Sequence, residues 1–274
     1  MKKMTDLLTY ELNRMKTGYV ILMGLIVVLQ TGAVFLVNHW YVRNFEIFQR
    51  ETQGSILEFQ EQFGPATYVD VVNNVFFNFA IFLGLILLCM YALGIWYRDW
   101  IGKNNLSYRL LTLPGSRMSI FFAKLLTILF MIAGLLALEL VVIVLGDQLL
   151  SMIVPNELYQ STTLVQVINM HPVLFIVLPP TIVDFFVHYI VGISALVVLY
   201  MMILLELSYK WKGILIDFAI VAVSFLVVIV AVQSSVFKYL FPHEVLLIGV
   251  FLSILCAVLA GFISKKLLQS KITV

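Results

Sequence analysis

Six long apolar stretches constrain this chain more than any other feature of its sequence. They lie at 18–38, 71–96, 119–145, 182–207, 214–233 and 243–264. Each has the roughly 20 largely apolar residues that a helix needs to cross a bilayer. A helix suits this task because it pairs its own backbone N–H and C=O groups inside the span. We therefore predict an all-α integral membrane protein with six transmembrane helices in a single domain, 1–274.

The composition agrees with this fold class. Hydrophobic residues make up 62% of the chain and charged residues 12%, with a mean hydropathy of +1.04. A soluble domain is about 45–50% apolar and about 25% charged, so this chain has too few polar residues to cover a water-facing globule. Both cysteines, Cys89 and Cys256, lie inside apolar stretches, and we expect no disulfide framework.

The basic residues predict the orientation of the spans. With the N-terminus inside, 14 of the 17 lysines and arginines fall on the inner side, and only Arg43, Arg50 and Lys238 fall outside. Short cytoplasmic loops are enriched in lysine and arginine. We therefore predict that both termini are cytoplasmic. The 14 inner residues are Lys2, Lys3, Arg14, Lys16, Arg98, Lys103, Arg109, Arg117, Lys124, Lys210, Lys212, Lys265, Lys266 and Lys271.

The N-terminal segment 4–16 is amphipathic, and we expect it to form an interfacial helix along the inner leaflet. Glu11 interrupts its apolar face, where an unpaired carboxylate is costly. We expect Glu11 to pair with a basic residue of the 98–117 segment. The alternative is that Glu11 reaches water at the level of the lipid headgroups.

Two segments are predicted on the outer side. The loop 39–70 mixes acidic and aromatic residues and is expected to form a short helical cap, with a solvated loop as the alternative. The element 146–181 contains the apolar stretch 164–178, which would be a seventh span if it were not split at Pro172. We expect this stretch to be re-entrant or interfacial, because its uninterrupted part is too short to cross a bilayer.

The predicted cytoplasmic loop 97–118 contains a turn signal and a short apolar-sided helix. Its sequence, with the start of the next helix, reads YRDWIGKNNLSYRLLTLPGSRMSIFFAKLL. Pro114-Gly115 marks a turn, and Ser116 or Ser119 can cap the helix that follows. A short helix with leucines on one side and basic residues at its flanks suits docking onto a soluble partner.

This loop resembles the segment between spans two and three in permease subunits of bacterial type-2 ATP-binding-cassette (ABC) exporters, and the six-span plan with an elbow helix resembles that family too. The resemblance implies that 106–117 is a coupling helix seated on a separate ATPase subunit. The residues expected to make this contact are Arg98, Arg109, Leu110, Leu111, Pro114 and Arg117. The alternative is that the arginines bind anionic lipid headgroups.

The resemblance also implies partners and a location. We expect an ATPase subunit, a second permease chain, identical or related, and membrane lipid as partners, with no nucleic acid, in the bacterial cytoplasmic membrane. ATP and Mg²⁺ are expected on the ATPase subunit, because the chain has no G-x-x-x-x-G-K-[ST] loop. We therefore expect neither a bound cofactor or metal nor enzyme activity in this chain. The exported substrate is expected to be amphipathic or hydrophobic, such as a peptide, toxin, lipid or drug.

Polar residues within the apolar stretches are candidates for the substrate pathway. They are Asn74, Asn78, Glu139, Asp184 and His188. Hydrogen bonding between helices is the alternative account. Two other functions remain open: an ion-coupled secondary transporter, and an intramembrane enzyme that uses Glu139, Asp184 and His188. Near the inner ends of spans four and five, Glu206 and Asp217 are expected to be paired at an interface.

Overall fold

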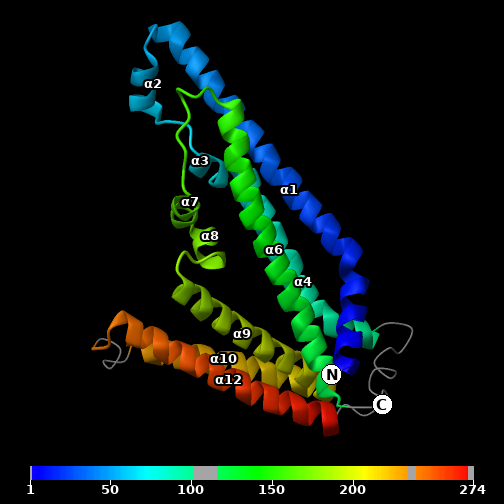
Figure 1. The fold of residues 1–274 in the computed structure, drawn as a ribbon. Coiled ribbons are helices and arrows are strands. Elements are labelled where there is room, and N and C mark those ends of the chain that lie inside the picture. Colours follow the sequence, from blue (N-terminus) through cyan, green and yellow to red (C-terminus); the bar gives the residue numbers. More distant parts are fainter. Residues whose placement is uncertain (1, 102–115, 234–238, 271–274) are drawn as a thin grey trace. The chain divides into compact units, whose positions relative to one another are not determined.

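The fold was analysed in a computed structural model, which describes residues 2–101, 116–233 and 239–270 (Figure 1). These ranges contain helices and no strand, apart from one isolated bridge between Ala66 and Tyr159. The helices are α1 (Lys2–Thr52), α2 (Ile56–Phe63), α3 (Tyr68–Val72), α4 (Val75–Ile101), α6 (Met118–Ile153), α7 (Leu164–Met170), α8 (Pro172–Val177), α9 (Ile182–Tyr209), α10 (Trp211–Gln233) and α12 (Pro242–Ser270).

Five helices in the described ranges are long and apolar enough to cross a membrane, as a multi-pass membrane protein requires. They are α1, α4, α6, α9 and α12. They account for five of the six predicted spans. The sixth, 214–233, is helical as α10 but is not one of these five, so its crossing of the membrane stays a prediction.

Helix α1 is much longer than the sequence predicts. The expected interfacial helix 4–16 and the first span 18–38 are one continuous helix of 51 residues. The first proline of the chain is Pro65, and a lone glycine such as Gly18 does not stop a helix as proline does. At about 1.5 Å per residue, α1 is about 75 Å long, far more than the thickness of a hydrocarbon core.

The predicted loop 39–70 is therefore mostly helical. It contains the end of α1, then α2 and α3, with a turn at Gln53 in the left-handed region (φ 51°). Ser55 begins α2 through a capping box: its backbone N–H donates to Glu58 Oε2 at 2.9 Å, and its hydroxyl accepts from the Glu58 N–H.

The chain groups into two compact units, which are described separately. The first unit contains 1–11, 90–127 and 183–274, and the second contains 12–89 and 128–182. In the second unit, α1, α4 and α6 are long helices that lie side by side (Figure 1). Phe59 of α2 is fully buried, and its ring packs against Tyr41, Phe45 and Phe48 of α1 with centroids 5.1–5.5 Å apart.

Two glycines of α6 allow tyrosines to approach its backbone closely in the second unit. The Tyr19 hydroxyl donates to the Met131 carbonyl at 2.8 Å, and a Cβ at Gly134 would collide with that hydroxyl. A Cβ at Gly146 would collide in the same way with the hydroxyl and ring of Tyr68. Alanine at either glycine would therefore displace a packed ring.

The segment 164–178 does not form a seventh span. It forms the short helices α7 and α8, of seven and six residues, which meet at His171. His171 ends α7 and caps α8, and Pro172 occupies the first position of α8. Proline suits this position because a backbone N–H in the first helical turn has no acceptor within the helix. Proline lacks this N–H, so no helical hydrogen bond is lost. Neither helix is long enough to cross a bilayer, as the sequence predicts.

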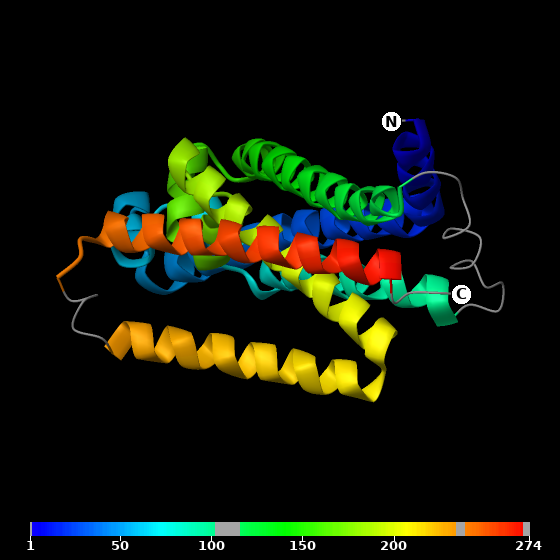
Figure 2. The ribbon, with the colours of Figure 1, turned by 90° about the horizontal axis from the view of Figure 1, so that it is seen from below.

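In the first unit, three buried rings join three helices. Trp96 of α4, Phe121 of α6 and Tyr200 of α9 lie with their centroids 5.6–6.2 Å apart. Figure 2 shows α10 and α12 as two long, uninterrupted helices. Helix α12 is much less covered than α9: within the chain, 39% of the apolar window of α9 is buried, but only 6% of that of α12.

Candidate functional site

A buried lysine lies at the centre of a highly charged site in the first unit. Lys124 is in the second turn of α6, and its side chain is 2% exposed. Its ammonium donates hydrogen bonds to Glu11 Oε1 at 2.9 Å, to the Ile95 carbonyl at 2.8 Å and to the Asp99 carboxylate. An ammonium has three protons, so these three acceptors use its full hydrogen-bonding capacity.

Glu11 connects this lysine to an arginine. Its other oxygen, Oε2, accepts from Arg98 Nη2 at 2.8 Å. The ion pair expected between Glu11 and the 98–117 segment is therefore present in the structure. Lys124 is a second partner of Glu11 that the sequence analysis missed. The signal was available, because a lone lysine in the apolar stretch 119–145 needs a buried counter-ion.

We call Glu11, Arg98, Asp99 and Lys124 the charge cluster. It contains two carboxylates and two cations, so its formal charges cancel. Transfer of such groups from water into an apolar interior costs several kcal/mol per ion unless each finds partners. Aromatic rings add to the pairing: Lys124 Nζ lies 5.3 Å from the centroid of the Trp96 ring, and Arg98 lies 5.5 Å from that of Tyr91.

The charge cluster joins the helices that flank the predicted coupling loop. Asp99 lies two residues before the end of α4, and Lys124 lies six residues after the start of α6. Glu11 ties both helix ends to α1. Of the residues expected to contact an ATPase, four lie outside the described ranges: Arg109, Leu110, Leu111 and Pro114.

Arg117, also expected to contact an ATPase, binds the last turn of α12. Its Nη1 donates to the Leu268 carbonyl at 2.6 Å. The last four carbonyls of a helix have no partner within the helix, so a cation there both pairs a carbonyl and complements the helix dipole. Arg117 therefore has a structural role within the first unit.

Glu139 is buried in the second unit, where it pairs with Gln30 of α1. Gln30 Nε2 lies 2.9 Å from each carboxylate oxygen of Glu139. Gln30 is fully buried, and its Oε1 has no hydrogen-bond partner among the described residues. The pair joins two membrane-length helices by one amide, and the Glu139 carboxylate makes no ion pair with a residue that the structure describes.

Asn78 and His171 form a second polar network in the second unit. Asn78 Nδ2 donates to the carbonyls of Val72 and Asn74 at 3.1 and 3.0 Å, so its Oδ1 is the acceptor for His171 Nε2 at 2.9 Å. The Leu174 N–H donates to His171 Nδ1 at 3.1 Å. The imidazole is therefore neutral, with its proton on Nε2. Burial lowers the pKa of His171, in keeping with this neutral form.

The other predicted pathway residues are held by local contacts. Asn74 Oδ1 accepts from the Phe76 N–H at 2.9 Å at the start of α4. On α9, His188 Nδ1 lies 2.7 Å from the backbone carbonyl of Asp184. Asp184 and His188 belong to the first unit and Glu139 to the second. Among the residues that the structure describes, no group of three or more His, Cys, Asp or Glu side chains is placed to hold a metal ion.

The expected pairing of Glu206 is different in the structure. Its carboxylate accepts a hydrogen bond from the Tyr97 hydroxyl of α4. Asp217 Oδ1 is buried and has no hydrogen-bond partner among the described residues. A tyrosine hydroxyl can donate a hydrogen bond, so it satisfies a carboxylate oxygen of Glu206 without adding a charge.

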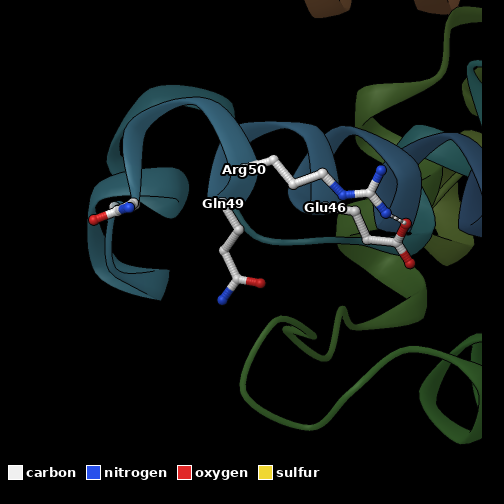
Figure 3. Close-up of a pocket in the computed structure, with 5 residues that line it drawn as sticks. Glu46, Gln49 and Arg50 are labelled. Carbon is white, nitrogen blue, oxygen red and sulfur yellow. Dashed lines mark ion pairs between the residues drawn. The ribbon is translucent and has the colours of Figure 1, made fainter.

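A surface pocket of about 430 Å³ lies at the end of α1, as Figure 3 shows. Glu46 and Arg50 pair across one helical turn at 3.7 Å, and Gln49 points away from this pair. The opposite charges of this pocket therefore neutralise each other.

Comparisons of the chain with protein-family models, with curated proteins and with solved structures find no match.

Proposed function

We propose that this chain is the permease subunit of an ABC exporter, which forms the translocation pathway and is driven by a separate ATPase subunit. The observation that carries the proposal is the motif-bearing loop between α4 and α6, together with the buried ion pairs at the two helix ends beside it. The resemblance implies six spans, and the five membrane-length helices of the described ranges support the proposal.

The charge cluster supports a mechanical role for this loop. If an ATPase displaces this loop, the displacement reaches the spans only when α4 and α6, the helices on either side of the loop, are held together rigidly. Lys124 bonds both Asp99 and the Ile95 carbonyl of α4, and through Glu11 it bonds α1. Because a broken buried pair leaves a charge without compensation, the three helix ends are expected to move as one body.

The remaining parts of the proposal follow from the resemblance of the loop. The chain would work with a second permease chain in the bacterial cytoplasmic membrane, with both termini cytoplasmic. ATP and Mg²⁺ would be bound by the ATPase. The substrate would be amphipathic or hydrophobic, because few charged residues lie within the long apolar helices.

The test is affinity purification of the tagged full chain from its native membranes, followed by measurement of vanadate-sensitive ATP hydrolysis in the eluate. Arg109→Glu is the informative variant, because Arg117 already holds the end of α12. We expect Arg109→Glu to reduce the co-purified activity at least about tenfold, since a reversed charge at a docked interface costs several kcal/mol. Arg43→Glu, on the exposed predicted outer side, is the matched control and is expected to have no effect.

Two results would overturn the proposal. One is an eluate of the unchanged chain that hydrolyses no ATP. The other is equal activity in the Arg109→Glu and Arg43→Glu preparations.

A second candidate function is ion-coupled secondary transport, and the Gln30–Glu139 pair favours it. Glu139 is a buried carboxylate in a membrane-length helix with no ion pair among the described residues, and such a group is the kind that carries protons in transporters. This function predicts uptake driven by a pH gradient in liposomes that contain the purified chain alone. It also predicts that Glu139→Gln abolishes this uptake, whereas an ABC permease alone would show none.

A further inference from the structure

A second pocket, of about 350 Å³, lies in the second unit where α1, α3 and the start of α4 meet. We call it the aromatic pocket. Its α1 residues are Leu36, Val37, Trp40, Tyr41 and Asn44. They recur every three or four positions and so share one face of the helix.

Aromatic rings and a carboxylate line this pocket together. Trp40, Tyr41 and Phe76 contribute the rings, and Asp70 contributes the carboxylate. None of the lining residues, all of which lie in the described 2–101 range, is basic. Aromatic faces and carboxylates both attract cations, and a set of aromatic rings is the usual way in which proteins bind a quaternary ammonium group.

The carboxylate of Asp70 is held in place but is not neutralised. Its Oδ2 accepts from the Thr67 N–H at 3.1 Å and from the Thr67 hydroxyl at 2.9 Å. Asp70 makes no ion pair with any residue in the described part of the chain. Tyr41 is also fixed, because its hydroxyl donates to the Gly64 carbonyl at 2.7 Å. Groups that are already positioned lose little entropy when a ligand binds.

The other end of the aromatic pocket is apolar. Leu36 and Val37 lie at the predicted outer end of the first span, and Trp40 is 69% exposed. Tryptophan is enriched where a membrane protein passes from hydrocarbon to headgroups. A ligand that fills this pocket would therefore need both a charged head and an apolar tail.

From these observations we propose that the aromatic pocket binds a cationic amphiphile. Its ammonium head lies against Asp70 and the rings of Trp40, Tyr41 and Phe76, and its alkyl tail lies along Leu36 and Val37. The pocket in Figure 3 is a poor alternative site for such a head, since Arg50 already neutralises Glu46 there and no aromatic side chain lines it.

This inference goes beyond the proposed function, because the pocket can be occupied whether or not an ATPase binds the chain. If the chain is an exporter, the inference narrows the substrate to amphiphiles with a cationic head. Binding is measured without any ATPase, so that a failure of this inference and a failure of the proposed function are distinguishable.

The experiment is equilibrium dialysis of radiolabelled dodecyltrimethylammonium against the full chain in dodecyl maltoside micelles, with empty micelles as the measure of partitioning. We expect saturable binding to the unchanged chain. Asp70→Asn removes the charge but keeps an oxygen that Thr67 can bond, and Trp40→Ala removes a ring. Each is expected to weaken binding about three- to tenfold, the range of one cation–π or carboxylate contact.

Glu61→Gln is the matched control, because it removes an exposed carboxylate of α2 that does not line the pocket. Equal binding by Asp70→Asn and Glu61→Gln, or no saturable binding at all, would overturn the inference. Competition by phosphatidylcholine in nanodiscs, and not by phosphatidylglycerol, would assign the site to a lipid headgroup. Without such competition, the site is assigned to a free amphiphile. Either result supports a site for a cationic head.

Discussion

The two units of this chain stabilise buried polar groups by different means. In the first unit the charge cluster balances two carboxylates against two cations, and every proton of Lys124 has an acceptor. In the second unit Gln30 binds Glu139, and Asn78 binds His171, through hydrogen bonds, and neither pair has an ion-pair partner in the part of the chain that the structure describes. Among the described residues, the buried ion pairs thus lie beside the loop that we propose is driven by an ATPase, and the buried polar pairs of the second unit rest on hydrogen bonds.

This difference predicts how much stability each unit loses when one of its buried polar side chains is replaced. A balanced set of buried charges is costly to break, because removal of one member leaves another uncompensated. A buried polar pair that rests on hydrogen bonds alone loses less when one partner is removed. The four predictions below test this ranking, from the largest expected effect to the smallest.

Lys124→Met is expected to have the largest effect. It leaves Glu11 and Asp99 buried without their common cation, and the loss of one partner of a buried pair costs about 3–5 kcal/mol. Thermal unfolding of the purified chain in detergent should show a large drop in Tm or a loss of folded protein. Arg98→Met should have a smaller effect, because the Arg98 side chain is 28% exposed. Similar Tm values for Lys124→Met and the unchanged chain would contradict the proposed importance of the cluster.

Gln30→Leu is expected to have an intermediate effect. It removes the amide that bonds both oxygens of Glu139, and an unsatisfied buried acceptor costs about 1–3 kcal/mol. Glu139→Gln is the comparison, because two amides can still bond each other without a buried charge. The Tm should therefore fall for Gln30→Leu and stay equal or rise for Glu139→Gln. A lower Tm for Glu139→Gln than for Gln30→Leu would show that the carboxylate has another partner.

The His171 network predicts a pH dependence. Burial lowers the pKa of His171 below its usual 6.5, so the unfolded chain binds a proton before the folded chain does. Neutral His171 therefore makes its full contribution to the free energy of unfolding above pH 6.5. This contribution is lost as the pH falls from 6.5 through the lower pKa that His171 has in the folded chain. The loss of the α8 cap is worth about 1 kcal/mol.

His171→Asn tests this dependence, because asparagine also caps helices but does not titrate. The difference in Tm between pH 8 and pH 5 should be smaller for His171→Asn than for the unchanged chain. Equal differences would mean that His171 does not contribute to the pH dependence of folding.

Arg50→Ala should have the smallest effect. It removes an ion pair from side chains that are 79% and 58% exposed, and exposed pairs within a helix contribute about 0.3–0.5 kcal/mol. Its Tm should stay within about 1 °C of that of the unchanged chain, and salt should remove the remaining difference. A drop as large as that of Lys124→Met would show that burial does not decide the strength of these pairs.

The fold class and the positions of five long helices could be predicted from the sequence, because hydrophobic length alone determines them. The boundaries of α1 could not, since no residue between 4 and 52 marks where a membrane helix should stop. The break between α7 and α8 was predictable, because Pro172 carries a clear local signal, but the two short helices on either side of it were not predicted.

The charge cluster was predictable in part, because one of its members is a clear local anomaly in the sequence. Glu11 interrupts an apolar face, and this anomaly indicated its ion pair with Arg98. Lys124 and Gln30 give equally local signals, but their partners are 113 and 109 residues away in sequence, and one sequence does not encode such pairings visibly. The aromatic pocket was missed except for Asn74, because its lining comes from three separate elements.

The sparse burial of α12 has a consequence for how this helix is held. Arg117 holds the last turn of α12, but only 6% of the apolar window of this helix is covered by its own chain, so the rest of the helix is positioned by whatever surrounds the protein. Thickness of the surrounding bilayer, or a neighbouring subunit, would then set its tilt. Conservative exchanges among the leucines, valines and phenylalanines of α12 should therefore leave the Tm of the isolated chain in detergent unchanged. We expect them to alter stability only in the native membrane.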